Sequence, residues 1–455
     1  MNDADKKKFI NPFNRKSWLT YFSSLLLRFK YARFLGLPSL KDIPDVLLER
    51  LYVPIYLDKT PSTDPLDETK KTYGIGQALK QSRRHVILGD PGSGKSTLTS
   101  HLTTLFASTR KHSLESMLGQ MIPLPFILRD YNIKKTITFQ GMLDQFQAQP
   151  FWPEEKGPSA DDLTGVLKAG QALIIMDGLD EIGDIERRRA LQEAINEGME
   201  NYPACVWIST SRIIGYEEVP FDSAENSDAR TQAKSPHLHY IQPFKKRQIS
   251  KFIENWYTLR EADPAVREKN ILSLETAIDG SDSIKRLAAN PNMLTMIALI
   301  HRVHATLPSG RVMLYDKITE AYLESIDTFR GIQETSVDKS RHILWLSELA
   351  FKMQKQRETK SDETPEILIP EPRIREIMGR NLDSSCDIDK ELSYIARRSG
   401  LLLPRKPGYY NFVHLSFQEY FAAIYLYDLG ICIQALMPGK KRSPAPLSWI
   451  SFKKK

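Results

Sequence analysis

From residue 84 onward, short apolar runs alternate with longer segments in which apolar positions recur at helical spacing. The apolar runs have the length and composition of buried strands. Five such runs occur: His85–Leu88, Ile122–Leu128, Ala172–Met176, Val206–Ser209 and Leu238–Ile241. Because strands that alternate with helices indicate a doubly wound parallel sheet, we predict an α/β domain over residues 84–244, its sheet sandwiched by helices.

Beyond Lys245 the periodicity is mostly helical as far as about Tyr427. This indicates a helical part of the chain after the α/β domain. The sequence shows no self-similarity at a period of about 20–50 residues, the spacing that indicates a solenoid or a propeller.

The composition is that of a globular protein, with 455 residues of which 41% are apolar and 26% are charged. No apolar run reaches the ~18 residues of a membrane span, and the N-terminus has no recognisable signal peptide. The three cysteines, Cys205, Cys386 and Cys432, are far apart and form no CxxC pair. This argues against a disulfide framework and a structural zinc site, and it predicts a cytoplasmic protein.

The net charge of +7 comes from the two ends of the chain. Residues 1–35 carry eight Lys or Arg against two Asp, and residues 440–455 carry six Lys or Arg. Since the part between them is acidic overall, the charge indicates basic tails rather than a basic binding core. We therefore predict no specific nucleic-acid binding.

Residues 89–96, Gly-Asp-Pro-Gly-Ser-Gly-Lys-Ser, match the phosphate-loop pattern GxxxxGK[ST]. They lie between an apolar strand and a helix, where backbone N–H groups and the helix N-terminus can surround phosphate oxygens. We expect Lys95 to reach the β- and γ-phosphates and Ser96 to ligate Mg²⁺. The predicted nucleotide-binding residues of this segment are Gly89, Asp90, Pro91, Gly92, Ser93, Gly94, Lys95, Ser96 and Thr97.

Acidic residues after the third apolar run supply the second half of the predicted site. Asp177 follows at the carboxyl end of a buried strand, where α/β sheets bind their ligands, and we expect it to hold Mg²⁺ mostly through water. Asp180 and Glu181 come next, at a spacing suited to polarising an attacking water molecule. The fourth run ends in Ser209–Arg212, and Arg212 is predicted to sense the γ-phosphate.

These three motifs, in this order, resemble those of the NACHT ATPases, within the STAND class of signalling NTPases. The acidic segment is the most distinctive, because a small residue, Gly178, follows Asp177 and an acid, Asp180, comes two positions later. The resemblance implies ATP or ADP with Mg²⁺ as cofactors. With a polar stretch after Asp58, it divides the chain into an N-terminal helical segment (1–60), a linker (61–83), an NTPase domain (84–244), a helical domain (245–335), a winged-helix domain (336–427) and a basic tail (428–455).

Two segments of the C-terminal half add to the resemblance. Leu287–Thr295 is similar to the NACHT helical-domain motif whose proline, here Pro291, lies against the adenine. Tyr410–Ala423 is similar to the winged-helix motif whose histidine, here His414, contacts the β-phosphate of ADP. From the residues alone, a histidine among aromatic side chains is also typical of a core.

The resemblance implies a switch that is ADP-bound and closed at rest, and ATP-bound and oligomeric after a trigger. The repeat-free form resembles bacterial members, many of which act in defence against phage, so a phage component is the expected trigger. Two alternatives stay open. One is a constitutively cycling P-loop ATPase or remodelling motor, and the other is a scaffold that nucleotide only stabilises.

The N-terminal segment Ser17–Leu35 is aromatic and basic. Helical spacing puts five residues on one face: Trp18, Phe22, Leu25, Phe29 and Ala32. One interpretation is an effector helix or a helix that contacts a membrane surface, which would make the protein peripheral to the membrane. The other is a helix packed on the NTPase domain or on a second copy of the chain.

Overall fold

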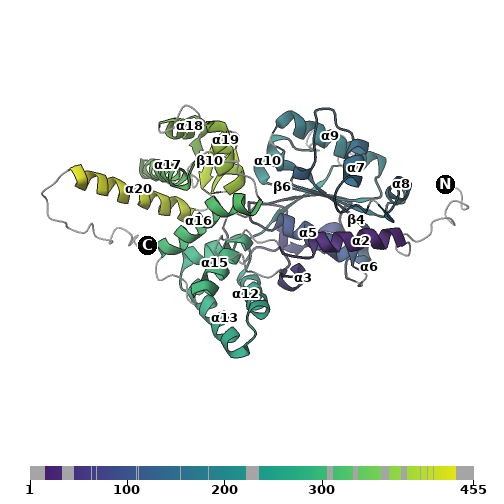
Figure 1. Ribbon diagram of the computed structural model, residues 1–455, viewed down its shortest axis with the longest axis horizontal. Coiled ribbons are helices and arrows are strands. Elements are labelled where there is room, and N and C mark those ends of the chain that lie inside the picture. The colour runs from purple at the N-terminus through teal and green to yellow at the C-terminus, as the bar shows by residue number, and fades with distance from the viewer. Residues whose placement is uncertain are drawn as a thin grey trace, which may run out of the picture. The chain divides into compact units, whose positions relative to one another are not determined.

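The computed structural model divides into two compact units, Met1–Arg330 and Gly331–Lys455 (Figure 1). The residues that it describes are 16–32, 46–221, 235–304, 311–330, 337–359, 368–380, 387–399 and 401–436, except 63, 68, 109, 111, 154, 183, 407, 413 and 414. Over these ranges, no helix combines the length and the apolar content needed to cross a membrane.

The first unit is built on a seven-stranded sheet in the order β2-β1-β7-β3-β6-β5-β4. Its parallel strands are β3 (Arg84–Leu88), β4 (Ile122–Ile127), β5 (Ala172–Asp177), β6 (Val206–Ser211) and β7 (His237–Ile241). Each coincides with one of the five predicted strands, which confirms the predicted parallel sheet. Every residue of β4, β5 and β6 is buried, as expected of strands covered on both faces.

Helices cover both faces of this sheet (Figure 1). On one face lie α5 (Lys95–Ala107) and α6 (Glu115–Leu118), and on the other lie α7 (Phe139–Gln147), α8 (Ala160–Lys168), α9 (Ile185–Asn201) and α10 (Ile213–Glu218). Polar caps fix the starts of several of these helices. Ser159 and Asp162 form a capping box at α8, and Asp184 accepts from the Arg187 N–H at α9.

The sheet begins earlier in the chain than the sequence analysis predicted. β1 (Tyr56–Asp58) pairs antiparallel with β7, and β2 (Tyr73–Gly74) pairs antiparallel with β1. The predicted linker 61–83 therefore contains β2 and α4 (Ile75–Leu79), and of the predicted N-terminal segment the described residues 56–58 form a strand of the same sheet. Strands of three and two residues are too short to show alternation, so they are defined only by their pairing, β1 with the β7 edge and β2 with β1.

The N-terminal helix α2 (Lys16–Phe29) packs on the NTPase domain. Trp18, Tyr21, Phe22, Leu25 and Phe29 are buried in the core cluster of this domain. The Tyr21 hydroxyl donates to the Pro123 carbonyl of the edge strand β4 at 2.8 Å. Because the aromatic face is buried in this way, the structure favours the interpretation of a helix packed on the NTPase domain over that of a membrane-surface helix.

Helices complete the first unit: α12 (Lys246–Arg260), α13 (Pro264–Asp279), α14 (Asp282–Ala288), α15 (Pro291–His304) and α16 (Arg311–Arg330). Asp263 caps α13 by accepting from two backbone N–H groups, and Pro264 occupies its first turn. The backbone N–H of Phe244 donates to the Ala289 carbonyl at 2.7 Å, which ties the end of the sheet to this helical part.

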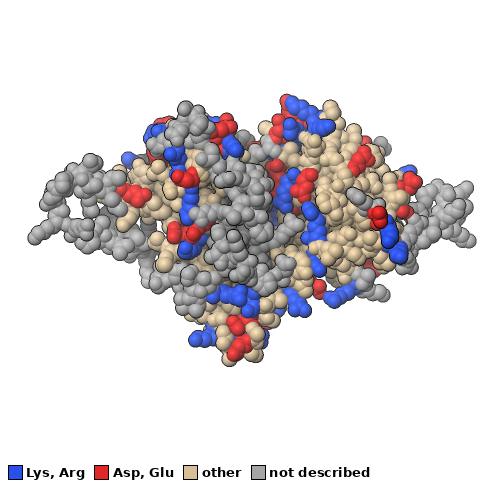
Figure 2. All heavy atoms as spheres, in the orientation of Figure 1, with Lys and Arg blue, Asp and Glu red and all other residues tan. Residues whose placement is uncertain are grey.

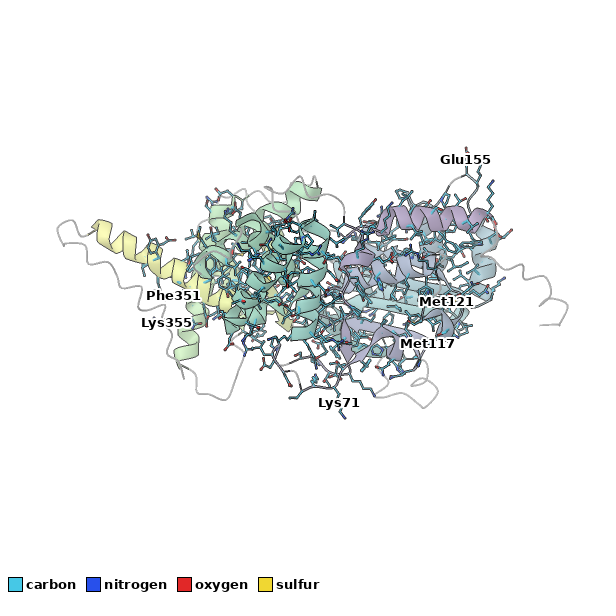
Figure 3. The ribbon with its side chains drawn as sticks, turned by 90° about the horizontal axis from the view of Figure 1, so that it is seen from below. Lys71, Met117, Met121, Glu155, Phe351 and Lys355 are labelled. Carbon is cyan, nitrogen blue, oxygen red and sulfur yellow. The ribbon has the colours of Figure 1, made fainter. Side chains whose placement is uncertain are left out.

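The second unit combines helices with a small antiparallel sheet in the order β8-β10-β9. Its strands are β8 (Ile369–Pro370), β9 (Leu402–Lys406) and β10 (Tyr409–Phe412), and its helices include α17 (Lys339–Thr359), α18 (Glu371–Gly379), α19 (Ile388–Ser393) and α20 (Leu415–Leu436). Phe351 on α17, labelled in Figure 3, stacks its ring on that of Tyr425 on α20 with centroids 4.9 Å apart. The buried His342 and Glu391 pair at 3.0 Å in its core.

Charged side chains of both signs are interspersed on the visible face in Figure 2. Among the described residues, some charged side chains form ion pairs between helices, such as Lys246 with Asp279 at 2.8 Å. Others lie within one helix, such as Lys251 with Glu254 at 2.8 Å.

Candidate functional site

The segment Gly89–Ser96 has the conformation of a phosphate loop between β3 and α5. Gly92 and Gly94 have φ of 74° and 99°, in the left-handed region that glycine adopts without steric cost. A Cβ on Gly92 would lie only 2.8 Å from the Asn290 side-chain oxygen. The loop therefore depends on glycine here both for its backbone conformation and for the approach of a neighbouring segment.

Lys95, the first residue of α5, folds back over this loop. Its ammonium group donates to the carbonyls of Gly89 and Asp90 at 2.7 and 3.0 Å. The pKa of this ammonium is lowered, because the effect of burial exceeds the opposite effect of the carboxylates of Asp180, Asp90 and Asp177. A cation held among acids at a loop of this shape is suited to binding a polyphosphate.

The loop also contains a buried polar atom that lacks a partner. The Ser93 hydroxyl is buried and makes no hydrogen bond to the rest of the described chain. Buried hydroxyl groups are normally hydrogen-bonded, so this one fits a ligand that brings acceptor oxygens to the loop. Ser96 and Thr97, in the first turn of α5, are exposed at the same place.

Strand β6 lies between the strand of the phosphate loop and the strand of Asp177, and it joins the two halves of the site. The Thr210 hydroxyl donates to the Asp177 carboxylate at 2.7 Å and accepts from the Gly178 N–H at 3.0 Å. On the other side, the Gly89 N–H donates to the Ser211 carbonyl at 3.2 Å. Asp177, which is 4% exposed, is thus fixed by the threonine of the Ser209–Arg212 segment.

Asp180 and Arg212 form an ion pair. The backbone N–H of Arg212 donates to one carboxylate oxygen of Asp180 at 2.9 Å, and its Nε lies 3.2 Å from the other. The Arg212 side chain is 23% exposed and the Asp180 side chain is 11% exposed. A Cβ added to Gly215 would lie 2.3 Å from the Asp180 Cβ, so α10 also confines this residue. The predicted water-polarising acid is therefore engaged by the predicted sensor arginine.

Glu181 faces a different arginine, which the sequence analysis missed. The Arg129 guanidinium lies 3.6 Å from the Glu181 carboxylate. Arg129 lies in the short helix η3 (Leu128–Asp130), directly after β4, and Glu181 ends η4 (Leu179–Glu181), after β5. Because Ile127 pairs with Asp177, both short helices start at the same edge of the sheet. Arg129 directly follows the predicted strand Ile122–Leu128, and this position at the carboxyl end of a strand could have marked it as a site residue.

The N-terminus of α15 contacts the phosphate loop directly. The Asn290 side-chain oxygen accepts from the N–H groups of Asn292 and Met293 and so caps the helix, in which Pro291 is the first residue. Its amide nitrogen donates to the Pro91 carbonyl at 3.0 Å. The N–H of Asn292 also donates to the Gly92 carbonyl at 3.2 Å. Pro291 therefore lies at the junction between the helical part and the loop.

The first unit thus brings together the phosphate loop, Asp177, Asp180, Glu181, Arg212 and Pro291. His414 lies outside the described residues. Where the chain is described, no group of three or more His, Cys, Asp or Glu could hold a metal ion by itself. Ser96 offers an exposed hydroxyl in the first turn of α5 and Asp177 a carboxylate at the end of β5, and these are oxygen groups of the kind that Mg²⁺ prefers.

Two models of known protein families match this chain. A model of the NACHT domain matches residues 83–260, and a model of the winged helix-turn-helix domain C-terminal to NACHT matches residues 311–426. The chain is a NACHT-family P-loop NTPase. The NACHT match begins at β3, so α2, β1 and β2 lie outside it, and the winged-helix match begins at α16, before the predicted boundary at residue 336.

A curated relative and two solved structures are similar to this NACHT chain. Protein NLRC5 of Mus musculus is 25% identical over 414 residues, which are 82% of this chain and only 18% of that protein. A Walker-type ATPase of Pyrococcus abyssi is 14% identical with a TM-score of 0.40, and covers 80% of this chain and 99% of its own. The ORC2 protein of Aeropyrum pernix is 12% identical with a TM-score of 0.35, and covers 83% and 100%.

Proposed function

We propose that this NACHT protein is a nucleotide-controlled switch that holds ADP at rest, exchanges it for ATP after a trigger and then self-associates. The observation that carries the proposal is the contact between the phosphate loop and α15. Asn290 and Asn292 bond to the carbonyls of Pro91 and Gly92, so the helical part is attached to the loop that would surround the phosphates. A hydrolase that only turned over substrate would not need this attachment.

The residues of the loop have separate roles in this proposal. Backbone N–H groups of the loop and the α5 N-terminus surround the phosphates, and Lys95 leaves the loop carbonyls to pair with them. Ser93 gives its unpartnered hydroxyl to a phosphate oxygen. Ser96 and Asp177 would hold Mg²⁺, which when bound would neutralise phosphate charge.

The pair of Asp180 and Arg212 gives the site an inactive arrangement. While Arg212 occupies the Asp180 carboxylate, this acid is not available to orient water. A γ-phosphate near Arg212 competes for the guanidinium, since phosphate and carboxylate bind arginine in the same forked manner. Asp180, with Glu181, is then free to orient the attacking water. After hydrolysis the ion pair of Asp180 and Arg212 forms again, and the switch returns to its resting state.

The expected energies show that nucleotide exchange alone is insufficient. Moving a population from 1:99 to 99:1 takes about 10⁴-fold differential affinity. One charge-assisted contact to the γ-phosphate supplies about 1.5–3 kcal/mol, which is only about ten- to a hundredfold. A trigger must supply the remainder, and we propose a phage component in this role. The likeness to an NLR protein supports a defence function.

The test is the identity of the nucleotide released when purified protein is denatured, measured by chromatography. The proposal expects near-stoichiometric ADP, and no release from Lys95→Ala as the matched control. Empty wild-type protein that hydrolyses ATP continuously without a trigger would favour a cycling ATPase or motor instead. If the protein binds nucleotide but Asp180→Asn and Glu181→Gln leave its biological activity unchanged, the result would favour a scaffold.

A further inference from the structure

We infer that Arg129 is a positioning residue for Glu181, and that the N-terminal helix α2 sets the position of Arg129 through Asp130. The inference rests on the proposed role of Glu181 in hydrolysis. It adds a regulatory input to the nucleotide site, carried by a helix that lies outside the NACHT match.

A chain of alternating charges connects the two places. The Arg28 guanidinium of α2 donates to Asp130 Oδ2 at 3.1 Å. The second oxygen of Asp130, Oδ1, lies 3.8 Å from Arg129 Nε. Nη1 of Arg129 then lies 3.6 Å from Glu181 Oε1. Asp130 therefore divides its two oxygens between the N-terminal helix and the arginine that faces the candidate catalytic acid.

The helix end of this chain is firmly placed. Tyr21 is buried and bonds to the Pro123 carbonyl of β4, the strand that leads into η3 and Arg129. The Trp152 ring packs on Tyr21 with centroids 5.0 Å apart. The Arg28 guanidinium lies over the Phe151 ring at 5.5 Å. Arg28 is therefore held against Asp130 by buried aromatic packing, so displacement of α2 would remove Arg28 from Asp130.

The other end of the chain is placed by the sheet. Arg129 and Glu181 extend from neighbouring parallel strands whose last paired residues are Ile127 and Asp177. Both side chains are about one-third exposed, at 34% and 36%. Exposed ion pairs of this kind stabilise folded proteins little, so a stability role is a poor account of the arrangement. A fixed cation beside a carboxylate that must orient water affects the rate instead.

Loss of the Arg28 contact leaves both oxygens of Asp130 free for Arg129. Arg129 would then shift toward Asp130 and away from Glu181, because the same guanidinium cannot hold both carboxylates equally well. Displacement of α2 by a trigger or by a neighbouring subunit would in this way slow hydrolysis and prolong the ATP-bound state.

The experiment measures single-turnover ATP hydrolysis and ATP affinity in full-length protein. Arg129→Ala is expected to lower the hydrolysis rate about ten- to a hundredfold while the Kd for ATP changes less than about twofold, since misplacement acts on the rate. Arg129→Lys should recover part of the rate. Arg110→Ala, which removes an exposed arginine paired with Glu49, is the matched control and should hydrolyse normally.

The connection to α2 is tested by Arg28→Met, which removes the charge and keeps an apolar stem over Phe151. This variant should slow hydrolysis alone and have no further effect in an Arg129→Ala background, because coupled residues are not additive. Wild-type hydrolysis in Arg129→Ala would overturn the positioning role, and additive effects of the two changes would overturn the connection. If Glu181→Gln hydrolyses ATP normally, the proposed catalytic role of Glu181 fails instead. Circular dichroism and thermal unfolding exclude loss of fold as the cause.

Discussion

The side-chain amide of Asn290 donates a hydrogen bond of 3.0 Å to the main-chain carbonyl of Pro91. One residue thereby caps α15 and holds the phosphate loop, because its side-chain oxygen accepts from the N–H groups of Asn292 and Met293. The conformation of the loop and the position of the helix are thus mechanically linked. A movement of α15 must break this bond or carry the loop with it.

Substitutions of Asn290 separate these two roles. Asn290→Ala loses both, and removal of a cap costs about 1 kcal/mol of stability. Asn290→Asp keeps an oxygen that can cap the helix but loses the donor to Pro91. We expect both variants to release ADP faster, measured by stopped-flow with a fluorescent ADP analogue, and only Asn290→Ala to unfold at clearly lower temperature. Equal ADP release in wild type and Asn290→Asp would contradict the linkage.

Removal of the two candidate catalytic acids should separate binding from hydrolysis. Asp180→Asn combined with Glu181→Gln is expected to retain ATP and to accumulate assembled protein, because Lys95 and the loop stay intact while water is no longer oriented. Chromatography of the bound nucleotide and light scattering check this. Glu186→Gln, which alters an exposed acid paired with Lys135 nearby, serves as control. Hydrolysis at the wild-type rate in the double variant would rule out these roles.

His414 separates a switch from a plain ATPase. If it bonds to the β-phosphate of ADP in the closed state, its loss removes about 1.5–3 kcal/mol from that state alone. His414→Ala is then expected to release ADP about ten- to a hundredfold faster and to assemble without a trigger, since each 1.36 kcal/mol is about tenfold. ADP dissociation and light scattering measure both effects, with circular dichroism as the folding control. A folded, monomeric variant with wild-type ADP release would make His414 a core residue.

Two buried histidines predict how stability depends on pH. His85 Nδ1 and His239 Nε2 lie 3.0 Å apart. The other ring nitrogen of His85 bonds to the Ser82 carbonyl, and that of His239 bonds to the Tyr73 hydroxyl. Burial lowers the pKa of both histidines to about 4. An unfolded histidine has a pKa of about 6.5, so between these values the unfolded chain binds protons that the folded chain does not. The contribution of these histidines to the free energy of unfolding should therefore be complete above about pH 6.5 and be lost as the pH drops toward 4.

Thermal unfolding at a series of pH values measures this dependence. His239→Gln removes one of the two histidines, and its unfolding temperature should vary less steeply between about pH 6.5 and 4. The variant and wild type should differ least in slope above that window. An identical slope in both proteins would show that other groups control the acid sensitivity.

The sequence predicted those parts of the molecule whose structure depends on residues close together in the chain. The phosphate loop, the acid that ends β5 and the five parallel strands each have their pattern within a few positions of the chain. The packing of α2 could not be predicted in this way, because its amphipathic face is equally suited to contact with lipid, with a second copy of the chain or with its own domain. Arg129 and the pairing of Asp180 with Arg212 were missed for a related reason, since only the order of strands in the sheet brings them together.

The pairing of β1 with β7 has a practical consequence for anyone who isolates the NTPase domain. β7 is held on one side by β3 and on the other by β1, through Leu57 with Ile241 and Asp58 with Tyr240. A fragment that starts at residue 83, where the family match begins, would leave the outer row of β7 backbone groups bare. An uncovered strand edge is a template for another chain, so such a fragment should precipitate or form fibrils, whereas one that starts before α2 should not.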